Sequence, residues 1–119
     1  MKKPFTCRRR KIGSARFDVN MDVQFSSQNA EGIGVVRNLA MRGALIETHA
    51  RVKRDGHLKL FLTLQNRADL LEISAAAVRW VRGHHVGVEF LKLDTEALRQ
   101  LMRYLADIHV AARSQRKVA

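Results

Sequence analysis

Apolar and polar residues alternate along most of the chain, and this alternation predicts strands. The first run spans residues 17–25, where every second side chain is apolar: Phe17, Val19, Met21, Val23 and Phe25. A period of two is typical of a half-buried antiparallel strand. The same period predicts two strands within residues 32–47, on either side of a polar break at 38–43, and further strands over residues 58–64, 70–82 and 86–90.

The strand predicted over residues 70–82 changes phase along its length. Its apolar positions shift from Leu71 and Ile73 to Val78 and Trp80. A shift of this kind predicts a β-bulge, which we expect near Ala76 and Ala77.

After Leu93 the spacing of apolar residues changes to three and four, which predicts a helix. Asp94 can cap its N-terminus, and the apolar positions run to Ala112 with charged residues on the opposite face. Residues 113–119 are basic and carry no pattern, so we expect a frayed tail.

These elements predict one domain with an all-β fold and a C-terminal helix. Six strands joined by short turns favour a six-stranded antiparallel β-barrel, and the lack of crossover helices excludes a parallel α/β fold. The 119 residues leave no room for a second domain. We expect a flexible basic arm at 1–16, the barrel with its helix at 17–112, and the basic tail at 113–119.

The charge of the chain favours a negatively charged partner. It holds 22 Lys and Arg against 11 Asp and Glu, a formal net charge of +11. Nucleic acid, a nucleotide, anionic lipid and acidic protein all satisfy this requirement.

Several features indicate a cytoplasmic protein without catalytic groups. The single cysteine, Cys7, cannot form an internal disulfide, and the Arg8-Arg9-Arg10-Lys11 run stands where a secretion signal would need apolar residues. No apolar run is long enough to span a membrane.

No pair of acids is spaced for acid-base catalysis, so we predict no enzyme. His84 and His85 would point to opposite faces of a strand, so we predict no metal site.

The stretch from Gly32 to Glu47 is the strongest candidate for a binding site. Gly43 follows a bulky Met-Arg pair, and we expect it to take a positive φ angle that lets the chain reverse tightly. Such a turn would expose backbone amides beside Asn38.

These residues resemble the PilZ domain family over roughly residues 8–105. The resemblance depends on the basic arm that ends at Arg16, on the Val36-Arg37-Asn38-Leu39-Ala40-Met41-Arg42-Gly43-Ala44-Leu45-Ile46 stretch, on Val78-Arg79-Trp80-Val81, and on Gly87-Val88-Glu89-Phe90 before the helix. It implies a six-stranded barrel with a C-terminal helix that binds cyclic dimeric GMP (cyclic di-GMP).

The resemblance also implies which residues bind that ligand. The family has two arginines separated by three residues in the arm, and an Asp or Asn followed by Ser two positions later and Gly three after that. Arg16, Asn38 and Gly43 match these motifs, whereas Ile12 replaces the first arginine and Ala40 replaces the serine. The loss of one hydroxyl hydrogen bond would weaken binding by about tenfold. Arg9 or Arg10 is the expected substitute for the missing arginine.

The implied site is therefore Arg9, Arg10, Arg16, Asn38, Ala40 and Gly43, with no cofactor besides the ligand. We expect a receptor or adaptor whose arm closes over the barrel on ligand binding and presents a surface to an effector protein. The alternative is a degenerate domain that does not bind the ligand and acts through protein contacts alone. Charge-driven binding to a nucleic-acid polymer is a third hypothesis, which the absence of arrayed aromatic residues disfavours.

Overall fold

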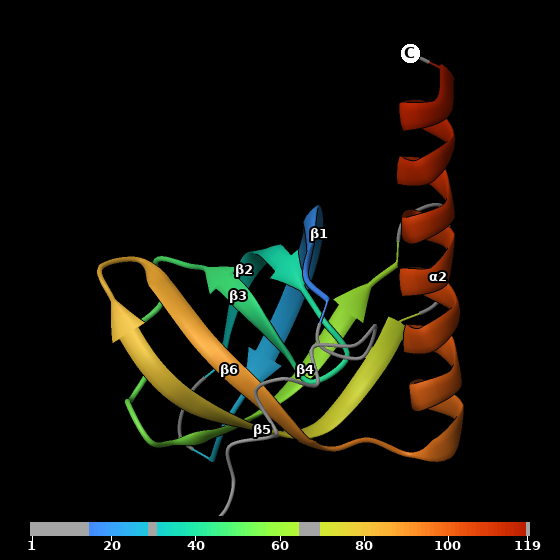
Figure 1. Ribbon diagram of the computed structural model, residues 1–119. Coiled ribbons are helices and arrows are strands. Elements are labelled where there is room, and N and C mark those ends of the chain that lie inside the picture. Colours follow the sequence, from blue (N-terminus) through green and yellow to red (C-terminus); the bar gives the residue numbers. More distant parts are fainter. Residues whose placement is uncertain (1–14, 29–30, 65–69, 119) are drawn as a thin grey trace, which may run out of the picture.

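Six antiparallel strands of the computed structural model close into a barrel, and one helix stands beside it (Figure 1). The structure describes residues 15–28, 31–64 and 70–118, with side chains as far as Ala111. The elements are β1 (Phe17–Ser26), β2 (Glu31–Leu39), β3 (Gly43–Glu47), β4 (His57–Thr63), β5 (Leu70–Arg82), β6 (His85–Lys92) and α2 (Thr95–Val118).

The strand order around the barrel is β1-β2-β3-β6-β5-β4, and pairing of β1 with β4 closes it. Each neighbouring pair is antiparallel. The β1–β4 pairing joins residues 23–26 of β1 to residues 59–62 of β4, and it removes an edge that would otherwise be a template for pairing with another chain. The predicted fold class, a six-stranded antiparallel barrel with a C-terminal helix, is confirmed.

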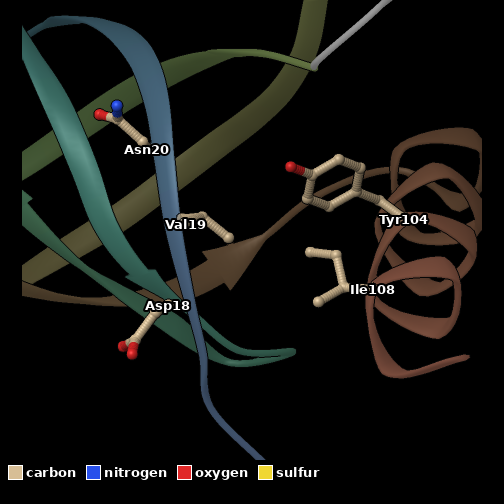
Figure 2. A pocket seen from close by; sticks show the side chains of 5 residues that line it. All are labelled: Asp18, Val19, Asn20, Tyr104 and Ile108. Carbon is tan, nitrogen blue, oxygen red and sulfur yellow. The ribbon is translucent and has the colours of Figure 1, made fainter. Parts of the chain in front are cut away.

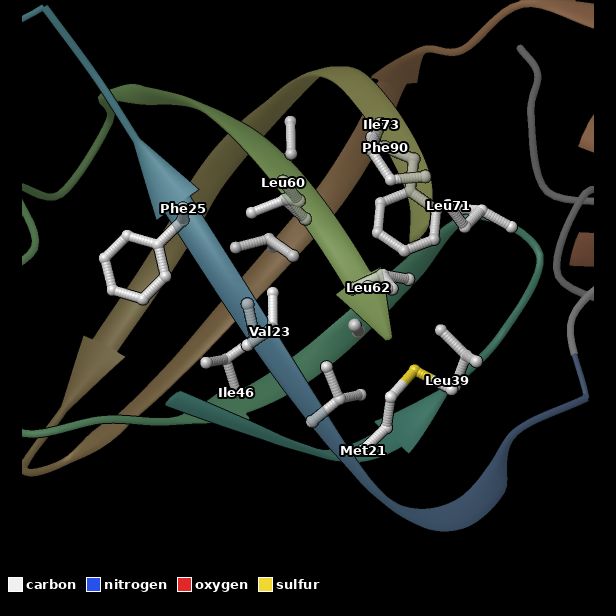
Figure 3. Packing of buried hydrophobic residues seen from close by; sticks show 14 of the residues in the cluster. Met21, Val23, Phe25, Leu39, Ile46, Leu60, Leu62, Leu71, Ile73 and Phe90 are labelled. Atoms are coloured by element: carbon white, nitrogen blue, oxygen red, sulfur yellow. The ribbon is translucent and has the colours of Figure 1, made fainter. Parts of the chain in front are cut away.

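The core lies inside the barrel and is built by the alternation visible in the sequence. In β1, for example, Met21, Val23 and Phe25 are buried while Asp22 and Gln24 are exposed. Figure 3 shows inward-facing side chains from every strand meeting there. Burial of these side chains provides the main stabilising free energy of the fold.

Helix α2 docks against β5 and β1 through one apolar face. Asp94 caps its N-terminus as predicted: the Ala97 amide donates to the Asp94 carboxylate at 2.8 Å. Figure 2 shows Val19 of β1 directed at Tyr104 and Ile108 of the helix. Burial between these elements raises the pKa of the Tyr104 hydroxyl above its usual value.

The structure tests one of two predicted segment boundaries, the C-terminal end of the helix, but not the N-terminal arm. The predicted end of the helix at Ala112 is wrong, because α2 continues to Val118. Residues 113–118 contain Arg, Gln and Lys and no Gly or Pro, so they extend a helix that has already formed even though they carry no apolar face. The predicted arm at 1–16 lies outside the described residues except for Ala15 and Arg16.

Strand β5 is interrupted twice in its pairing with β6. One register shift lies between Ala75 and Ala76, beside the predicted bulge. The other lies between Val78 and Trp80 and was not predicted. Because a bulge adds one residue to one strand, it changes which side chains face outward beyond it.

Within the described part of the chain, no helix has the length and apolar character needed to cross a membrane.

The docking of α2 predicts unequal effects for two neighbouring substitutions. Leu101 is 0% exposed against the barrel, whereas Met102 is 52% exposed. Leu101→Ala should lower the free energy of unfolding by about 2–5 kcal/mol, because it removes buried methyl groups and leaves a cavity. Met102→Ala, the matched control, should change it by less than about 0.5 kcal/mol. Urea denaturation would measure both, and equal effects would contradict this docking.

Candidate functional site

Arg16 and Asn38 meet at the entrance of β1. The Arg16 Nη1 atom donates to Asn38 Oδ1 at 2.9 Å, and Asn38 Nδ2 donates to Asp18 Oδ1 at 3.3 Å. Asp18 and Asn38 are also cross-strand partners in the β1–β2 pairing, so the strand register itself brings these polar groups together. Two residues predicted from distant parts of the chain thus form one contact.

The turn that follows Asn38 is held by backbone hydrogen bonds. The Ala40 amide donates to the Gly43 carbonyl at 2.9 Å, and the Phe90 amide donates to the Arg42 carbonyl at 2.7 Å. The predicted exposure of backbone amides beside Asn38 is therefore wrong for the amide of Ala40, which is already paired within the turn. The turn itself is fixed in place against β6.

Gly43 has a role different from the predicted one. Among the glycines in the described ranges, only Gly83 has a positive φ angle. A Cβ atom at Gly43 would instead collide with the Val88 carbonyl oxygen of β6. Glycine is needed here because β3 and β6 approach too closely for a side chain.

A cleft of about 290 Å³ opens where this turn meets β5 and β6. Three arginines line it: Arg16, Arg42 and Arg79. Small residues make up much of its remaining surface: Ala40, Gly43, Ala44 and Gly87. The combination of guanidinium groups with small residues suits a flat, negatively charged ligand.

Trp80 forms one wall of the cleft and lies over Gly87. These two residues are cross-strand partners, and a Cβ atom at Gly87 would collide with the indole Nε1 and Cε2 atoms. The absence of that Cβ lets the ring lie down on β6, and Trp80 remains 39% exposed. The Arg82 guanidinium lies 5.6 Å from the ring centroid, within the range of a cation–π contact.

Arg79 and Glu89 form an ion pair beside this ring. Arg79 Nη2 lies 2.6 Å from Glu89 Oε1, and both residues line the cleft. A similar pair joins Arg37 to Glu47 at 2.8 Å, but neither of those residues lines the cleft. The hydrogen bond and charge of Arg37 hold the pKa of the Glu47 carboxyl below its usual value.

Of the predicted site residues, the structure brings four together. Arg16, Ala40 and Gly43 line the cleft, and Asn38 binds Arg16 at its margin. Arg9 and Arg10 lie outside the described residues.

The residues of the cleft that sequence reasoning missed include four with charged or aromatic side chains: Arg42, Arg79, Trp80 and Glu89. Arg42 lies inside the predicted motif, so its sequence position was a usable signal. The other three come from β5 and β6, and their place in the cleft depends on strand register.

The histidines give no metal site within residues 15–28, 31–64 and 70–118. The His84 ring stacks at a tilt on the ring of His49, with centroids 4.4 Å apart. No group of three or more His, Cys, Asp or Glu side chains in these ranges could hold a metal ion.

Strand β1 connects this corner to helix α2. Asp18 and Asn20 bond to Asn38 and Arg37 of β2. On the alternate positions, the Phe17 ring meets the ring of His109 at a centroid distance of 6.1 Å, and Val19 faces the helix (Figure 2). Strand β1 therefore contacts both the candidate site and the helix.

The tight approach at Gly43 predicts a specific loss of stability. Gly43→Ala should lower the free energy of unfolding by about 1–3 kcal/mol, because the added methyl forces β3 away from β6. Thermal denaturation would measure this change.

Gly83→Asn is the matched control for that variant. Nothing lies within 4 Å of a Cβ atom at Gly83, and Asn tolerates a positive φ angle, so this variant should melt close to the unaltered protein. A Gly43→Ala variant as stable as this control would contradict the account of Gly43.

Several solved structures share the fold. YcgR from Escherichia coli in complex with cyclic di-GMP matches with a TM-score of 0.72 and 14% identity, covering 88% of this chain and 49% of that chain. The inhibitor of motility MotI from Bacillus subtilis matches with a TM-score of 0.67 and 17% identity, covering 81% and 49%. The PilZ domain of CeSA from a cellulose-synthesizing bacterium matches with a TM-score of 0.63 and 13% identity, covering 80% and 98%.

The chain is thus similar to about half of YcgR and of MotI and to nearly all of the isolated CeSA domain. No curated protein matches it. At such low identities the structures establish a common fold. The family follows from the sequence itself, because the model of the PilZ domain matches residues 8–107, and the chain therefore belongs to the PilZ domain family.

Proposed function

We propose that this protein is a receptor for cyclic di-GMP and acts as an adaptor that presents a surface to an effector protein. The observation that carries the proposal is the cleft in which Arg16, held by Asn38, lies with Arg42, Arg79 and the exposed ring of Trp80. The ligand has two phosphates and two guanines, which call for cationic forks and flat stacking surfaces. The similarity of the fold to YcgR, which was solved with this ligand, supports the assignment.

Two other arginines of the cleft can supply the positive charge that the missing first arginine of the family motif would have provided. Ile12 stands at that position, and Arg42 and Arg79 already border the cleft. Positive charge at the ligand therefore does not depend entirely on Arg9 or Arg10 reaching across. Those two residues remain candidates for closing over the bound ligand.

The adaptor part of the proposal is supported by β1. A ligand that binds Arg16 competes for the guanidinium that now donates to Asn38, and Asn38 in turn bonds to Asp18. The neighbouring residues Phe17 and Val19 contact helix α2. Binding is thereby linked to the surface of the helix, which we propose as the region that an effector contacts in the cytoplasm.

The first test is calorimetric titration with cyclic di-GMP at about 0.15 M salt. Arg16→Ala should weaken binding by about tenfold to a hundredfold, because it removes charged hydrogen bonds to the ligand. Arg99→Ala, which removes an exposed arginine of α2 that pairs only loosely with Glu96 at 3.8 Å, is the matched control and should bind normally. Absence of heat with the unaltered protein at hundreds of micromolar ligand would contradict the proposal and favour a domain that acts through protein contacts alone.

A second test restores the family residue at position 40. Ala40 is 5% exposed and lines the cleft, so Ala40→Ser places a hydroxyl where the family usually has one. One additional hydrogen bond to the ligand should tighten binding by up to about tenfold. Ala106→Ser on the exposed face of α2 is the control, and an unchanged or weaker affinity of the Ala40→Ser variant would show that position 40 does not face the ligand.

A further inference from the structure

We propose that Arg79 and Glu89 select guanine over adenine by contacting the edge of a base that stacks on Trp80. This inference rests on the proposed function and names the residues that read the base. Neither residue belongs to the arginine pair or to the Asn38–Gly43 motif, from which the family resemblance implies the ligand-binding residues.

The bulge in β5 places these groups together. Adjacent residues of a regular strand face opposite sides, but the pairing with β6 shifts between Val78 and Trp80. Arg79 and Trp80 are consequently both exposed and both line the cleft. Bulges often re-aim side chains in this way beside binding sites.

Gly87 sets the position of the stacking surface. The indole Nε1 and Cε2 atoms of Trp80 lie over the glycine backbone, and the side chain remains 39% exposed, so part of the ring is open to a base. A base stacked on the exposed part of the ring would have its edge beside Glu89, which is two residues along β6 from Gly87 and on the same side of the strand.

The Arg79–Glu89 ion pair leaves part of the hydrogen-bonding capacity of the Glu89 carboxylate unused. Arg79 Nε and Nη2 both contact the same oxygen, Glu89 Oε1, at 2.7 and 2.6 Å. These contacts do not occupy Oε2 of Glu89. The two side chains are 55% and 44% exposed, so a ligand can reach both.

The chemistry of the pair matches guanine and opposes adenine. Guanine offers the N1 and N2 hydrogens to a carboxylate and the O6 and N7 acceptors to a guanidinium. Adenine presents an acceptor at N1 and a donor at N6, so each group of the pair would meet a partner of the wrong kind at that edge. Arg79 and Glu89 together therefore distinguish guanine from adenine, whereas stacking on Trp80 alone would accept either base.

Location distinguishes this ion pair from the other strand-to-strand pairs of the described residues. Arg37 pairs with Glu47, and Lys59 pairs with Glu72. Neither pair lines the cleft with Trp80. The Lys59–Glu72 pair is similarly exposed, with Glu72 at 48%, and it therefore supplies a control of the same chemistry on the same strand as Arg79.

The experiment compares calorimetric affinities for cyclic di-GMP and cyclic di-AMP. The unaltered protein should prefer the guanine ligand. Glu89→Gln should weaken cyclic di-GMP binding by about tenfold to a hundredfold and change cyclic di-AMP binding much less, so the preference narrows. Glu72→Gln should keep both affinities of the unaltered protein.

A second variant distinguishes a loss of base selectivity from a loss of folding. Arg79→Lys keeps the positive charge but removes the guanidinium fork that contacts two acceptors. It should reduce the preference for cyclic di-GMP over cyclic di-AMP and leave the melting temperature unchanged. If the unaltered protein binds cyclic di-GMP and both cleft variants keep its full preference, this inference is wrong and the proposed function stands. If the unaltered protein does not bind cyclic di-GMP, both are wrong.

Discussion

The close approach of β3 to β6 at Gly43 is the constraint on which the candidate site depends. Only a residue without a Cβ fits against the Val88 carbonyl, and the hydrogen bond from the Phe90 amide to the Arg42 carbonyl holds the adjacent turn to the same strand. The corner that begins at Asn38 is thereby brought to the side of β6 on which Gly87 lies next to Trp80 of β5. Without this approach the arginines of the corner and the indole would belong to separate surfaces.

A second glycine and one bulge complete the arrangement. Gly87 lets the Trp80 ring lie on the strand, and the register shift before Trp80 turns Arg79 to the same side. Both features weaken a sheet locally, since glycine contributes no packing and a bulge breaks the ladder of hydrogen bonds. Local irregularities of this kind are common where a sheet serves a binding site.

Much of the fold could be predicted from the sequence, but only three of the eleven residues that line the cleft, Arg16, Ala40 and Gly43. The alternation of apolar and polar residues over 17–25 directly indicates which side chains are buried, and Asp94 is a local signal for a helix N-terminus. The predicted strand and the predicted helix cap were both confirmed. The pairing of Trp80 with Gly87 depends on the register between two strands after a bulge, which no local pattern records. For the same reason Gly43 was identified as important but assigned to a turn conformation, because its neighbour Val88 is distant in sequence.

The central claim is that the Arg16–Asn38 corner and the Trp80 wall form one cyclic di-GMP site. Trp80 is the only tryptophan of the chain, so its fluorescence reports on this wall without interference. Titration with cyclic di-GMP at about 0.15 M salt should produce a saturable change in emission, with a midpoint equal to the calorimetric dissociation constant. Binding heat without any change in Trp80 emission would place the ligand elsewhere and contradict the account.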